Sequence, residues 1–228
     1  MPFEHVEVGD ILFFSAPPNP HLGTLAQINA QMKLSLYSCS CYNKKDYTLT
    51  HVAICIYKDI ENIRIAHIRA SRMPDYHDKV HNGFCIDNKV FMEDHMSTRR
   101  YFALRPKNKN FAADLANHVG DEKNSAIVWS NKEYDRAHSF FSCYSRRKNL
   151  SNAFSQETLC SRFVAEAVAH IQGEISCFDK ANLCVMTLKQ QLMKTKLFNL
   201  IPQDELDVNP NIGHNITQPT EKSLLLNN

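Results

Sequence analysis

Short runs of β-branched and aromatic residues, several of them alternating with polar residues, mark the first half of the chain. These runs cover residues 10–14, 51–57, 63–68, 84–86 and 100–104. Runs of this kind, bounded by turn-forming residues, are typical of β-strands. The second and third runs are separated only by residues 58–62, which is a loop length typical of a hairpin. The pattern therefore predicts a mainly antiparallel sheet.

Helical spacing of apolar residues dominates the second half. Apolar residues recur three and four positions apart in 111–119, 157–173 and 181–196, as in helices that bury one face. Gly173 provides a natural end for the second of these helices. Strands first and helices later indicate an α+β fold in which the sheet packs against helices.

The hydrophobic pattern loses its regularity near residue 200. The segment 201–228 contains Pro202, Pro210 and Pro219, several asparagines and few apolar residues before its last few positions. Such a composition is typical of irregular chain. We therefore expect one domain over residues 1–200, followed by an irregular C-terminal tail over 201–228.

Charge and glycine content exclude several classes of partner. The formal net charge is only +2, and the charged residues are interspersed, so no basic face for nucleic acid is expected. The six glycines nowhere form the G-x-G-x-x-G or P-loop patterns that cradle dinucleotides or phosphates. No apolar run is long enough to cross a membrane. We expect no cofactor, no nucleic acid partner and no transmembrane segment.

The cysteines and the first residues bear on location. Eight cysteines are scattered along the chain, and the start has no basic region followed by an apolar stretch. Reduced thiols and a cytoplasmic location are the expectation, or export without a classical signal peptide. Twenty asparagines against six glycines suit a bacterium with an AT-rich genome. A secreted effector with a host target is therefore included among the hypotheses.

Cys160 is the candidate nucleophile. It shares a helical stripe with Val164 and Val168, and either Thr158 or Ser155 can cap the helix just before it. Unpaired N–H groups and the positive end of the dipole in a first turn favour a thiolate. The alternative is a buried, inert cysteine, and only a base nearby distinguishes the two.

Two histidines of the predicted hairpin supply that base. If Tyr57 pairs with Ile63, Ala53 lies opposite His67, and His51 lies on the same face one diagonal step away. A register tighter by two residues places the histidines directly opposite each other, whereas an odd shift separates them. An imidazole held by a second polar group is what an activated thiol needs. The alternative for each histidine is a strand residue that bonds only to backbone or water.

Five short motifs occur in a characteristic order. They are Gly9-Asp10-Ile11-Leu12-Phe13-Phe14, Thr50-His51-Val52-Ala53-Ile54, Ile65-Ala66-His67-Ile68, Tyr134-Asp135 and Leu159-Cys160-Ser161-Arg162-Phe163-Val164. In this order the histidine strand precedes the cysteine helix. Over most of residues 8–172 the chain resembles the circularly permuted NlpC-type papain-like cysteine hydrolases, which include YiiX-like and lecithin:retinol acyltransferase branches. The resemblance implies a permuted papain-like fold.

The resemblance also implies a role for each residue of a triad. Cys160 would be the nucleophile, His51 the general base and His67 the residue that orients it. The third position is a glutamate in many YiiX-like members and a histidine in the acyltransferase branch. Arg162 departs from the common Cys-Ser-Glu of the YiiX-like pattern. Should His67 point away from His51, the other candidates for the third position are Asp10, Asp135 and His138.

The expected activity is that of a papain-like cysteine peptidase or amidase, which cleaves an amide or ester through a thioacyl intermediate. Its substrate would be a peptide, a lipid amide or an ester. Two alternatives stay open. One is a thiol acyltransferase, in which a nucleophile other than water takes the acyl group, and the other is a non-catalytic binding module on the same fold.

A zinc hydrolase is the third hypothesis, and the sequence argues against it. His77 and His81 nearly match H-E-x-x-H, but Asp78 replaces the glutamate, and Pro74 and Gly83 favour a loop over a helix. Cys39-Ser40-Cys41 has no partner pair at zinc spacing. We therefore expect no metal site.

Overall fold

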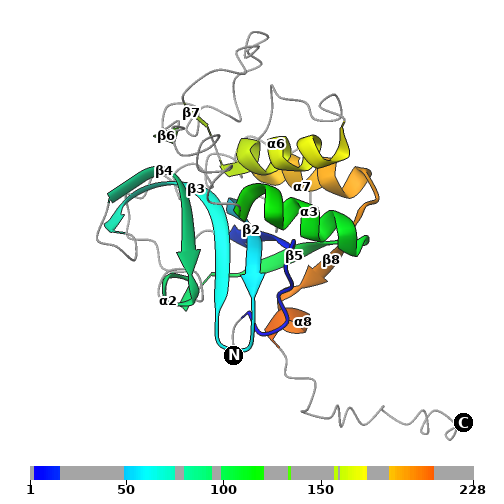
Figure 1. The fold of residues 1–228 in the computed structure, drawn as a ribbon, viewed down its shortest axis with the longest axis horizontal. Coiled ribbons are helices and arrows are strands. Elements are labelled where there is room, and N and C mark those ends of the chain that lie inside the picture. The colour runs from blue at the N-terminus through cyan, green and yellow to red at the C-terminus, as the bar shows by residue number, and fades with distance from the viewer. Residues whose placement is uncertain are drawn as a thin grey trace, which may run out of the picture.

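The structure is a computed structural model that describes residues 3–15, 49–74, 80–93, 99–120, 133–134, 157–158, 160–173 and 185–207. Its centre is a six-stranded sheet of order β4-β3-β2-β1-β5-β8, in which every neighbouring pair is antiparallel (Figure 1). The strands are β1 (Ile11–Ser15), β2 (Leu49–Lys58), β3 (Ile63–Pro74), β4 (Val80–Asn88), β5 (Tyr101–Pro106) and β8 (Phe198–Pro202). A separate short parallel pair joins β6 (Glu133–Tyr134) to β7 (Glu157–Thr158).

Three helices cover one face of the sheet. They are α3 (Lys109–Gly120), α6 (Cys160–Gln172) and α7 (Val185–Lys194), and all three pack on β2 (Figure 1). Two short helices, α2 (Lys89–Phe91) and α8 (Gln203–Asp207), lie away from this group. None of the helices among the described residues is long and apolar enough to cross a membrane.

Two hydrophobic clusters fill the two sides of the sheet, because successive side chains of a strand point to opposite faces. The helix-side core combines residues of β1, β2 and β3, such as Val52 and Ile68, with residues of α3, α6 and α7, such as Phe163. The opposite core combines alternate residues of the same strands, such as Ala53 and Ile65, with residues from both ends of the described chain. The sheet is therefore covered on both faces.

The β2–β3 hairpin contains one irregularity that matters for the site. At its tip Lys58 pairs with Ile63, one residue off the register expected from the sequence. A bulge between Cys55 and Tyr57 then restores that register, so that Ile54 pairs with Ala66. Continued by one residue, this pairing places Ala53 opposite His67, as predicted.

The α+β class, the antiparallel sheet and the five predicted strands are confirmed, and the predicted helix 111–119 is confirmed as α3. The helix predicted from residue 157 begins at Cys160, because residues 157–158 form β7 instead. The helix predicted from residue 181 is described from Val185. Residues before it, from 174 to 184, lie outside the described residues.

The expected domain boundary near residue 200 requires a correction. It falls inside β8, which pairs with β5, and the chain then continues into α8 up to Asp207. Pro202 is compatible with this because it is the last residue of an edge strand, where a missing N–H donor costs little. The rest of the predicted tail, 208–228, lies outside the described residues.

Candidate active site

His51 and His67 meet on the sheet, as the sequence predicts. His51 lies on β2 and His67 on the neighbouring strand β3, and the two rings are joined by a hydrogen bond of 2.7 Å between His51 Nε2 and His67 Nδ1. Their ring planes are nearly perpendicular, with centroids 4.9 Å apart. His51 is 9 % exposed and His67 is fully buried. Solvent therefore hardly competes for this bond.

Asp87 extends the pair on the far side of His67. This carboxylate belongs to β4, and its Oδ2 lies 2.7 Å from His67 Nε2. Asp87 is 1 % exposed. Both ring nitrogens of His67 are thus engaged, one by an imidazole and the other by a carboxylate. The result is a buried chain Asp87–His67–His51 that crosses three adjacent strands.

The sequence motifs do not include Asp87, although a signal for it exists in the strand pairing. His67 pairs directly with Cys85 in the β3–β4 register, and Asp87 is two residues further along the same strand. Residues two apart point to the same face, so Asp87 lies one diagonal step from His67. The sequence predicts only residues 84–86 of β4. Without the full extent of the strand and its register, the Asp87 carboxylate cannot be aligned with His67.

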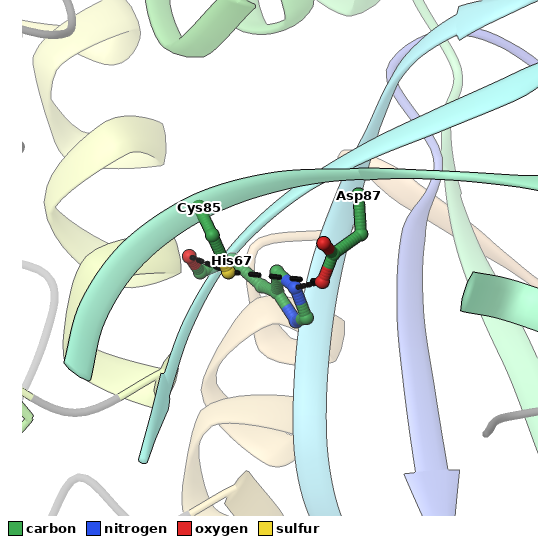
Figure 2. A group of neighbouring side chains, drawn as sticks. All are labelled: His67, Cys85 and Asp87. Carbon is green, nitrogen blue, oxygen red and sulfur yellow. Dashed lines mark hydrogen bonds and ion pairs between the residues drawn. The ribbon is translucent and has the colours of Figure 1, made fainter. Parts of the chain in front are cut away.

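Cys85 completes the surroundings of His67. Figure 2 shows His67 between Cys85 and Asp87, which both project from β4. The Cys85 thiol donates weakly to the His67 carbonyl and to Asp87 Oδ2, each at 3.8 Å. Burial alone would lower the pKa of His67, but the neighbouring Cys85 sulfur and the hydrogen-bonded Asp87 carboxylate outweigh it and raise the pKa to about 9. The site therefore favours a positive charge on His67.

Cys160 is the first residue of α6 and is 4 % exposed. The first turns of α6 lie over the end of the sheet that carries the histidines. The contact that shows this is between the rings of Phe163 and Phe84, whose centroids are 5.7 Å apart. Phe84 pairs with Ile68, the residue that follows His67. The α6 N–H groups that lack helical partners lie at this same end.

Cys160 packs on the helix side of the sheet, whereas His51 packs on the opposite side. Cys160 and Leu49 belong to the helix-side core, whereas His51 touches Phe14 of the opposite core. Leu49 and His51 are two residues apart and would share a face in a regular strand. The β1–β2 register shifts at this point, between Phe14 and Ser15. This bulge explains why Leu49 and His51 point to different faces of the sheet.

His67, Cys85 and Asp87 also have the donor set of a metal site, and their ligand atoms lie within 4.8 Å of one another. Two ligands of a tetrahedral zinc, each about 2.0–2.1 Å from the ion, are about 3.3 Å apart. The 2.7 Å between His67 Nε2 and Asp87 Oδ2 is shorter than that and has the length of a charge-assisted hydrogen bond. The geometry favours a hydrogen-bonded cluster over a metal centre.

The other sequence candidates do not join this cluster. Asp10 is buried and accepts two hydrogen bonds from Arg105, from Nε at 3.0 Å and from Nη2 at 2.9 Å. The side chain that binds the Asp10 carboxylate is therefore an arginine and not one of the two histidines. The remaining candidates Cys39, Cys41, His77, Asp135 and His138 lie outside the described residues, as does the side chain of His81.

Comparison with known proteins adds no relative. No family model matches the chain, and no curated protein or solved structure matches it significantly.

Proposed function

We propose that this protein is a cysteine-dependent acyl hydrolase of the permuted papain-like type. Cys160 attacks the carbonyl of an amide or ester, His51 takes the thiol proton, and His67 orients His51. The observation that carries the proposal is the 2.7 Å bond between His51 Nε2 and His67 Nδ1. This bond leaves His51 Nδ1 as the ring nitrogen that can take a proton from a thiol.

The start of α6 supports the same assignment. A thiolate is stabilised at a helix N-terminus by backbone N–H groups and the helix dipole. The same N–H groups can bind the oxyanion of a tetrahedral intermediate. The substrate is a peptide, a lipid amide or an ester, and water releases the acyl group in the second step.

Thiol reactivity tests the proposal directly. The full chain is treated with iodoacetamide at pH 6, and each cysteine-containing peptide is quantified by mass spectrometry. Cys160 should react first, because its thiolate persists at this pH. Cys55 is the matched control, since it is buried on the same strand as His51 and burial raises its pKa to about 12. His51→Ala should abolish the preference for Cys160.

Equal modification of Cys160 and Cys55, or a preference that survives in His51→Ala, would contradict the proposed mechanism and favour a binding module. Turnover is then measured on peptide, long-chain amide and ester substrates, with Cys160→Ala as the inactive reference. Cys160→Ala should lose several orders of magnitude in kcat. Adding an acceptor amine or alcohol separates hydrolysis from acyl transfer, because a transferase forms the new amide or ester at the expense of the free acid.

A further inference from the structure

The hydrogen bonds that link Asp87, His67 and His51 determine which ring nitrogens carry protons. Asp87 Oδ2 can only accept when the carboxylate is ionised, so His67 Nε2 carries a hydrogen and donates it. In neutral His67 the other nitrogen, Nδ1, then carries the lone pair. His51 Nε2 must donate to that lone pair, which leaves the lone pair of His51 on Nδ1. Asp87 thus selects, through His67, the tautomer in which His51 can act as a base.

We propose that Asp87 is a positioning residue and that the two histidines form a proton relay which places the positive charge of the active site on His67. This inference rests on the proposed function and deepens it.

The relay balances in both directions. When Cys160 loses its proton, the S–H bond breaks and an N–H bond forms at His51 Nδ1. The His51 Nε2 proton moves to His67 Nδ1, so that His67 becomes the imidazolium and donates from both nitrogens. When the leaving group departs, His51 Nδ1 gives up its proton to it and His51 Nε2 recovers a proton from His67 Nδ1. Asp87 stays ionised throughout.

The surroundings of the two rings explain why the charge moves inward. His67 is completely buried and its Nε2 lies 2.7 Å from the carboxylate of Asp87, whereas His51 is 9 % exposed and is separated from that carboxylate by the His67 ring. A buried cation is stable only beside an anion, because desolvation is costly for an unpaired charge. The imidazolium beside Asp87 is therefore lower in free energy than one on His51.

The first test measures the protons themselves. Side-chain ¹⁵N NMR spectra are recorded on the full-length Cys160→Ala variant, which lacks the thiol. Spectra of His51→Gln and His67→Gln assign the signals of the two rings. Between pH 6 and 8, His67 should be protonated on both nitrogens, while His51 stays neutral with its hydrogen on Nδ1. A charged His51 beside a neutral His67 would overturn the relay. This readout does not depend on catalysis, so it stands or falls separately from the proposed function.

The second test measures the effect of Asp87 on the thiol. The rate of Cys160 alkylation is recorded against pH for the wild type and Asp87→Asn. Without the carboxylate, the pH midpoint of the reaction should rise by at least about one unit, equivalent to a tenfold loss of reactivity at low pH. Asp87→Glu restores a carboxylate and should recover part of the shift.

Asp10→Asn is the control, because Asp10 is also a buried carboxylate but is bound by Arg105. It should leave the midpoint unchanged. An unchanged midpoint in folded Asp87→Asn would show that Asp87 has only a structural role and would overturn the proposal. If Asp87→Asn does not fold, the NMR measurement on Cys160→Ala decides.

Discussion

His67 has the most constrained environment of the polar residues at the candidate site. Its side chain is held from both ends, and its pKa is raised to about 9 although burial opposes this. A histidine whose pKa is higher in the folded state than in the unfolded chain binds its proton more tightly when folded. That histidine adds stability below its unfolded value of about 6.5, and this contribution is lost as the pH rises through about 9.

The pH dependence of unfolding therefore reports on His67. Urea unfolding of the wild type and of Asp87→Asn, measured from pH 6 to pH 10, should show a difference in the free energy of unfolding that is largest near pH 6. The difference should shrink as the pH approaches 9, because the proton on His67 is then lost in both proteins. A difference that stays constant across this range would mean that Asp87 does not raise the pKa of His67.

The contact with Asp87 also changes what substitutions of His67 should do. A glutamate at position 67 can accept from His51 Nε2, as in many YiiX-like proteins, but here it would lie beside the buried Asp87. Two buried carboxylates in contact cannot both ionise. His67→Glu alone should therefore be nearly inactive, and His67→Glu combined with Asp87→Asn should regain part of the activity. Cys160 alkylation at pH 6 measures both variants, with His67→Leu as the inactive reference. Equal reactivity of the single and double variants would contradict this.

At the scale of the elements, two glycines with positive φ differ in how closely a neighbouring element packs against them. Gly9, in the turn before β1, has a φ of +88°, and a Cβ added there would lie 2.6 Å from atoms of Ala112 in α3. Gly173, which ends α6 as predicted, has a φ of +70° with nothing within 4 Å of such a Cβ. Both positions favour glycine, but only Gly9 also has a steric reason.

This pair gives a controlled prediction. Gly173→Ala should lower the free energy of unfolding by about 1–2 kcal/mol, the cost of a left-handed backbone for a residue with a Cβ. Gly9→Ala should cost clearly more, because α3 must also move away from the turn. Urea unfolding of both variants tests this. Equal losses in the free energy of unfolding would show that α3 can move away from the turn without loss of stability.

The elements also show what could be predicted from the sequence. Apolar and β-branched runs predict β1 and β2, because a sheet covered on both faces buries apolar residues throughout such strands, and alternation predicts β3. The even register that brings His51 and His67 together matches the expected one only because the bulge between Cys55 and Tyr57 offsets the one-residue shift at the hairpin tip. By contrast, β8 was missed because four of its five residues are exposed or only half buried, so no apolar run marks it. The local pattern predicts helix for residues 157–158, because their pairing with β6 is a contact between distant segments that a local pattern does not contain.

On the scale of the whole molecule, residues from both ends of the described chain cover the face of the sheet opposite the helices, where His51 lies. Phe3 and Leu206 belong to the opposite core together with Phe14. The centroids of the Phe14 and His51 rings are 6.2 Å apart. The backbone N–H of His5 donates to the Leu206 carbonyl at 2.9 Å, and the Tyr101 hydroxyl bonds to Asp207. Residues from α8, which were expected to be irregular, therefore belong to the packing around the site.

Leu206→Ala tests whether α8 is an essential part of the fold. Leu206 is fully buried, so its truncation should lower the free energy of unfolding by about 2–5 kcal/mol through lost burial and a cavity. Leu200→Ala on β8 is the matched control, because Leu200 is 45 % exposed and should cost much less. Urea unfolding gives both values, and Cys160 alkylation at pH 6 shows whether the loss reaches the site. Because the opposite core supports Phe14 and through it His51, reactivity should fall in Leu206→Ala and stay unchanged in Leu200→Ala. Equal stability of the two variants would place α8 outside the cooperative fold and would support the boundary near residue 200.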